Sequence, residues 1–323
     1  MAKTLAEVLH GAPVDVEEVR RVSETLIFER GFQGPKFFKF ACLLVLAASI
    51  ATFGLLGDSL AVVIGAMIVA PLMLPIMGLA FSISIGDRRK IISTLLVSLA
   101  GIVMAVGVGF VLTLPITQVT NPEAIQQIMI RTSPHLLDLM AALATGLAGA
   151  FALSRRDVSD TLPGVAIAVS LVPPLANVGI LLALGKPNLA SGSLLLFVTN
   201  YVAILLTGSL VFMLMGFRQV ALSPFDARAQ RRGLMVALVA LLIIAIPLSV
   251  TSYQLIVTNK VSARTYTLGQ AWLKGSGYRL ISVDAETTDG TVNLLLMGDG
   301  DLPSLNKLEE QARDILFGRT IRL

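Results

Sequence analysis

Long apolar blocks constrain this chain more than any other feature. Seven stretches carry almost no charge, and each has roughly the 20 residues that a helix needs to cross about 30 Å of hydrocarbon. They cover residues 37–56, 59–85, 91–114, 136–153, 162–184, 192–216 and 233–256. Only 14% of the 323 residues are charged and the mean hydropathy is +0.81, whereas soluble domains carry roughly 25% charged residues. The sequence therefore predicts an all-α polytopic membrane protein with about seven transmembrane helices, residues 37–256.

The charge of the connections alternates along the chain. Basic clusters precede the first block and follow the second, fourth and sixth; they are Arg20, Arg21, Arg30, Lys36 and Lys39, then Arg88, Arg89 and Lys90, then Arg155 and Arg156, then Arg218, Arg228, Arg231 and Arg232. The positive-inside rule places these clusters, and the N-terminus, in the cytoplasm. Seven spans would then put the C-terminal segment on the periplasmic or extracellular side.

The two ends of the chain differ from its apolar middle. Residues 1–36 are predicted to be a cytoplasmic segment with an amphipathic helix from Pro13 to about Arg30, lying on the membrane surface or on a partner subunit. Residues 257–323 alternate helical and period-two patterns, with a hairpin turn at Asp289-Gly290. They predict a small C-terminal α+β extramembrane domain in the order α-β-β-α-β.

Two of the apolar blocks resemble each other. The runs from Ile64 to Gly78 and from Pro163 to Gly179 superpose after a shift of 99 residues, which brings Gly65 onto Gly164 and Pro75 onto Pro174. Blocks three spans apart cross the membrane in opposite directions. The pattern predicts an inverted repeat, the arrangement found in many secondary transporters.

Prolines and a few polar residues in these blocks are the candidate site. Pro71, Pro75, Pro173 and Pro174 are predicted to break the second and fifth spans, and freed carbonyls in hydrocarbon must face protein or a water-filled cavity. Such residues are also frequent in membrane helices for packing alone, and that alternative stays open. Polar partners for a path are Ser170, Asn177 and Asn200, with Asn177 the leading candidate.

The same two segments resemble a known family. They read G-D-S-L-A-V-V-I-G-A-M-I-V-A-P-L-M-L-P-I-M-G from Gly57 and G-V-A-I-A-V-S-L-V-P-P-L from Gly164. Both are similar to the signature regions of a prokaryotic hydrophobic membrane family known as the domain of unknown function 389 family, over roughly residues 37–216. The resemblance implies a bacterial or archaeal protein of the plasma (inner) membrane, and it implies no particular activity.

Catalysis is not expected. The only histidines are His10 and His135, and neither clustered metal ligands nor a phosphate-binding loop is present. We therefore predict no enzyme activity, no cofactor and no metal site. Nucleic acid is not expected either, because the basic clusters set membrane orientation.

The remaining function classes are transport and partner binding. The leading hypothesis is a secondary transporter or channel-like protein for a small solute or ion, with a path at the broken helices and a polar crevice near Pro75 and Pro174. The alternative is a non-transporting membrane scaffold or sensor whose extramembrane domain binds partners. The small-residue runs from Gly101 to Gly109 and from Gly146 to Gly149 predict a homo-oligomer within the lipid bilayer.

Overall fold

A computed structural model describes residues 14–28, 31–155, 171–220, 226–285 and 291–299, together with 302–305, 308, 310, 312, 316 and 320–322. The chain divides into two compact units, Met1–Ile246 and Pro247–Leu323. Ser170 and the first half of the fifth apolar block lie outside the described residues.

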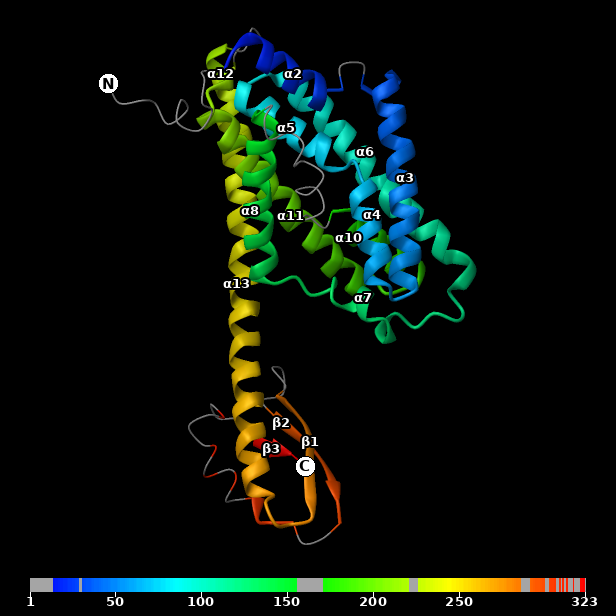
Figure 1. Cartoon of the computed structure of the whole chain (residues 1–323), viewed down its shortest axis with the longest axis vertical. Coiled ribbons are helices and arrows are strands. Elements are labelled where there is room, and N and C mark those ends of the chain that lie inside the picture. The colour runs from blue at the N-terminus through cyan, green and yellow to red at the C-terminus, as the bar shows by residue number, and fades with distance from the viewer. Residues whose placement is uncertain are drawn as a thin grey trace, which may run out of the picture. The chain divides into compact units, whose positions relative to one another are not determined.

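The first unit is helical (Figure 1). Its helices are α2 (Val16–Leu26), α3 (Pro35–Leu56), α4 (Leu60–Val69), α5 (Met73–Ile85), α6 (Arg88–Thr113), α7 (Gln126–Met129), α8 (Leu136–Ser154), α10 (Val172–Ala183), α11 (Pro187–Leu214) and α12 (Phe217–Val220). The long helix α13 (Ala227–Trp272) starts in this unit, and short 3-10 turns cover Gly31–Gln33, Leu114–Ile116 and Pro122–Ala124.

Five helical stretches are long and apolar enough to cross a membrane. They are Pro35–Leu56, Arg88–Ile116, Leu136–Ser154, Pro187–Leu214 and Ala227–Val250; α4 and α5 make a sixth if the bent pair is one span. The predicted class of apolar, helical membrane protein is confirmed at this level. The predicted count of seven is not, because the described part of the fifth block is the 12-residue helix α10, which is too short to cross alone.

Local chemistry explains where the helices begin and end. Pro35 and Pro187 each occupy the first turn of a helix, where a missing N–H costs nothing. Asp87 caps α6 by accepting from the N–H groups of Arg89 and Lys90 at 3.1 and 3.2 Å. Asp138 closes a capping box on His135 at the start of α8, so this carboxylate has a structural role.

The interior of the unit is formed by two short helices. All of α5 except Leu74 is buried, and ten of the twelve residues of α10 are buried, so both are enclosed by protein. The longer helices α3, α6 and α11 pack around them, and α8 packs on α11. Helices α6 and α13 present apolar side chains such as Val103 and Val236 outward. Helix α2 buries Val22 and Leu26 against α5 of the same chain.

The second unit is a small sheet with helical cover. Strands β1 (Tyr278–Ala285), β2 (Thr291–Gly298) and β3 (Thr320–Arg322) lie in the order β1-β2-β3, antiparallel and then parallel. Its core joins the end of α13 to the sheet and to residues spaced four apart, Leu308, Ala312 and Leu316. The small C-terminal sheet region predicted from period-two alternation is confirmed, while the hairpin residues Asp289 and Gly290 lie outside the described residues.

Candidate functional site

The second apolar block is broken. Helices α4 and α5 are separated at residues 70–72 and meet at a bend of 48°. Pro71 lies in the break, and Pro75 occupies the third position of α5. The first N–H groups of a helix have no acceptor within it, so proline at this place starts a helix inside apolar surroundings without leaving that donor unsatisfied. Neither proline interrupts a continuous helix; both belong to the new helix start.

The fifth block contains a matching helix start. Helix α10 begins at Val172, followed by Pro173 and Pro174 in its first turn. The helix starts at residues 73 and 172 differ by the 99 residues that the sequence predicts. The glycines after these two helices keep the same offset, since Gly86 and Gly185 both adopt left-handed backbone with φ of 70° and 68°.

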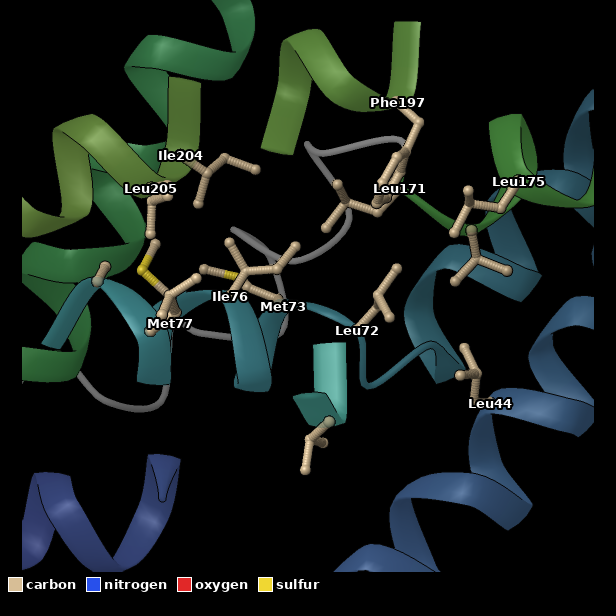
Figure 2. Packing of buried hydrophobic residues seen from close by; sticks show 14 of the residues in the cluster. Leu44, Leu72, Met73, Ile76, Met77, Leu171, Leu175, Phe197, Ile204 and Leu205 are labelled. Carbon is tan, nitrogen blue, oxygen red and sulfur yellow. The ribbon is translucent and has the colours of Figure 1, made fainter. Parts of the chain in front are cut away.

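The side chains around both helix starts are apolar. Figure 2 shows the packed cluster, which is formed by α3, α5, α10 and α11 and by the residues just before α5 and α10. The labelled members are Leu44, Leu72, Met73, Ile76, Met77, Leu171, Leu175, Phe197, Ile204 and Leu205. A cavity of about 270 Å³ opens at Pro71 and is lined mainly by apolar residues such as Ile68 and Met77. Among the residues described, the surroundings of Pro75 and Pro174 are therefore apolar rather than polar, because the walls of the break are built from Leu, Met and Ile.

Polar groups gather one turn further along α10. Asn177 is fully buried, and its Nδ2 donates to the Ile128 carbonyl at 3.1 Å and to Ser193 Oγ at 2.8 Å. Its Oδ1 has no hydrogen-bond partner in the described part of the chain. An unsatisfied buried acceptor costs about 1–3 kcal/mol, so this oxygen is available to accept from a further donor.

A buried arginine, Arg131, lies three residues after Ile128 in the chain. Arg131 is 8% exposed, and its Nη1 donates to the backbone carbonyl and, at 3.1 Å, to the side-chain Oε1 of Gln127. Its Nε has no partner, and no carboxylate pairs with it within the described ranges. Burial lowers the pKa of this guanidinium, because the charged form loses hydration.

The Arg131 backbone and the Asn177 side chain share one acceptor. The Ile128 oxygen accepts from the backbone N–H of Arg131 at 3.2 Å and from Asn177 Nδ2 at 3.1 Å. Gln127 N–H in turn donates to Asp58 Oδ1 at 2.8 Å. We call Asp58, Gln127, Arg131, Asn177 and Ser193 the outer polar cluster. The Asp58 carboxylate thus contacts the start of α7, while Ser59 occupies the cap position of α4.

An exposed ion pair fixes the loop that carries Arg131. Lys186 donates to Glu123 at 2.9 Å, just before α11 begins. The hydrogen bond from Lys186 lowers the pKa of Glu123, and its charge acts in the same direction. In the same loop Asn121 caps the short turn Pro122–Ala124 by accepting from Glu123 N–H at 3.2 Å.

The remaining candidates are scattered. Asn200 is 5% exposed and lies two helical turns beyond Ser193 on α11, and neither Asn177 nor Asn200 lines the cavity at Pro71. Sequence reasoning missed Arg131, Gln127 and Ser193. One signal was present, because Arg131 is a lone basic residue in the otherwise almost uncharged loop between α6 and α8. No group of three or more metal-ligating side chains occurs within the residues that the structure describes.

These features define a helical membrane protein whose interior holds two helix starts and an adjoining cluster of buried polar side chains. The model of the family described as Domain of unknown function (DUF389) matches residues 67–206. The family resemblance carried by the two motifs is thereby confirmed over the break, the outer polar cluster apart from Asp58, and most of α11.

A relative among curated proteins points the same way. An uncharacterised protein of Methanocaldococcus jannaschii is 28% identical over 207 residues, which is 62% of this chain and 63% of the relative. The match thus spans somewhat less than two thirds of that protein. No solved structure matches the chain.

Proposed function

We propose that this chain is a secondary transporter or channel-like protein for a small solute or ion. The observation that carries the proposal is the pair of short helices that start inside the domain and are buried on nearly all sides. Irregular backbone at membrane depth is tolerated where protein or a cavity surrounds it, and transporters place their binding sites at such interrupted helices.

The arrangement of the helices supports an inverted repeat. Helix α5 packs against α11 and α10 packs against α6, so each short helix lies on the long helix of the other half. The long helices begin at Arg88 and Pro187, again 99 residues apart. Figure 1 shows α3 and α8 running in opposite directions, as two inverted halves would.

The path in this proposal has a polar mouth and an apolar constriction. The outer polar cluster supplies an amide, a hydroxyl and an arginine at the mouth of the path. The Leu and Met side chains around the break form the constriction that comes next along the path. Hydrophobic constrictions close a path by excluding water. The buried charge of Arg131, which lacks a carboxylate partner among the described residues, favours an anionic solute over a cation.

The proposal includes an orientation of the chain in the membrane. Arg21 of α2 donates to the Leu153 carbonyl at the end of α8 at 3.0 Å, so the N-terminal helix lies at the end of the domain that carries the basic connections. We propose that this end is cytoplasmic, in a prokaryotic plasma membrane. Residues 257–323 would then be periplasmic or extracellular, and close packing of small residues would allow homo-oligomers.

The alternative function is a membrane scaffold or sensor that transports nothing and binds partners through its C-terminal unit. The apolar surroundings of both helix starts favour it, because a sealed bundle needs no polar lining. The two functions differ in whether water reaches the outer polar cluster, which a chemical test can decide.

Cysteine accessibility provides that test. With Cys42 replaced by alanine, Ser193→Cys and Ser209→Cys place a thiol at two buried positions of the same helix, one in the cluster and one near the other end. A charged, membrane-impermeant thiol reagent needs a hydrated thiolate. We expect S193C to react and S209C to stay unmodified from the outer side. If neither reacts in folded protein, the scaffold or sensor function is favoured.

A further inference from the structure

A second pocket lies away from the helix starts. It has a volume of about 730 Å³ and is formed by the beginnings of α6 and α13 with the middle of α11, all within the first unit. Most of its wall is apolar and includes Ile92, Leu95, Val236 and Ala240. The backbone N–H of Asp226 donates to the Gly86 carbonyl at 3.1 Å, and this bond ties the two helix beginnings together.

Three arginines line one end of this pocket. Arg88, Arg228 and Arg232 are exposed, and none forms an ion pair in the part of the chain that is described. Asp226 also lines the pocket, but its Oδ1 is engaged as the cap of α13, accepting from Arg228 and Ala229 N–H at 2.9 and 3.2 Å. The nearby Asp87 caps α6 and lies 3.8 Å from Lys90. The pocket therefore keeps a surplus of positive charge.

The pocket has the dimensions of one membrane leaflet. From Arg88 to Leu95 and from Arg228 to Ala240 the helices rise about 10 and 18 Å at 1.5 Å per residue. Half of a hydrocarbon core is about 15 Å thick. Ile92 and Val236 are 48% and 68% exposed, so the apolar wall faces outward, where acyl chains would lie against it.

We propose that this pocket binds one anionic phospholipid, with the phosphate held by Arg88, Arg228 and Arg232 and the acyl chains against the apolar wall. Basic pockets between transmembrane helices recognise anionic headgroups through the same chemistry, and guanidinium groups suit phosphate oxygens because they donate in a planar fork. A soluble phosphate compound would satisfy the arginines but would leave the apolar wall uncovered.

Native mass spectrometry of the purified full chain tests the proposal, with phosphatidylglycerol, phosphatidylcholine and glycerol phosphate as separate probes. We expect phosphatidylglycerol to bind and R88Q/R232Q to weaken it about 30-fold, equivalent to about 2 kcal/mol for two membrane-proximal arginines. The matched control is R89Q/R231Q, which removes the same charge from neighbouring positions outside the pocket. It should leave binding nearly unchanged.

A space-filling variant separates the pocket from general surface charge. Ala240→Trp keeps every arginine and fills the apolar end, so it should also reduce phosphatidylglycerol binding, with an unchanged size-exclusion profile as the folding check. The proposal is overturned if both arginine pairs weaken binding equally, if A240W has no effect, or if phosphatidylcholine or glycerol phosphate binds as tightly as phosphatidylglycerol. These outcomes do not depend on whether the protein transports a solute.

Discussion

Replacing Gly109 by valine should destroy the fold of the membrane domain, whereas the same change at Gly107 should be tolerated. A Cβ at Gly109 would overlap the Ala176 carbonyl of α10, and one at Gly179 would overlap the Val106 carbonyl of α6. The two backbones are in direct contact, so no side-chain rotation can make room. Overpacking commonly costs about 1–3 kcal/mol, and a branched side chain against rigid backbone belongs at the upper end or beyond.

Gly107 supplies the matched control. It lies on the same helix, two residues earlier, and a Cβ there meets nothing within 4 Å. G107V should therefore change stability by less than about 1 kcal/mol. Thermal unfolding in detergent, followed by size exclusion, measures both variants. Equal stability of G109V and G107V would show that α6 and α10 do not pack as closely as described, and the interior position of α10 would be wrong.

Replacing Arg131 by methionine should preserve or raise stability while abolishing most transport. Exchanging a buried charge for an apolar group of similar size is often neutral or stabilising by about 1–4 kcal/mol, and Arg131 has no carboxylate partner among the described residues that would be left behind. If its charge contacts the solute, losing that contact costs about 2 kcal/mol or more, which is at least about tenfold in rate.

Arg131→Lys is the control for this prediction. It keeps the charge but loses the planar donor pattern that reaches Gln127, so it should retain part of the transport. Thermal unfolding and solute flux are measured on the same preparations. A methionine variant that is strongly destabilised would identify Arg131 as a structural residue. One that is stable and fully active would exclude it from the path.

The length of the apolar runs predicted the helical membrane class, because run length is a local property of the sequence. A 20-residue apolar run has one stable form in hydrocarbon, so α3, α6 and α11 were predictable to within several residues. The 99-residue offset was visible because glycine and proline positions fix helix ends. The C-terminal sheet was predictable from alternation alone.

Other features depend on packing that no local pattern encodes. The prolines were expected to break helices, and the break at Pro71 is present, but only tertiary structure shows Pro75 and Pro174 in first turns and surrounded by apolar side chains. Asp58 lies just before α4 in the chain, yet its carboxylate contacts Gln127, 69 positions later. Such long-range pairing is set by how α7 packs against α3.

The measurement that tests the central claim most directly is solute and ion flux into liposomes that contain the purified protein. The variant N177L/P174A removes the cluster amide and a first-turn proline of α10, and P187A/N188L makes the same two changes at exposed positions on α11. The account predicts flux with the native chain, strongest for anions, its loss in N177L/P174A, and its retention in the control. The absence of flux over a wide panel of ions and small solutes, with protein that is folded and correctly oriented, would contradict a path through the helix starts and favour the scaffold or sensor function.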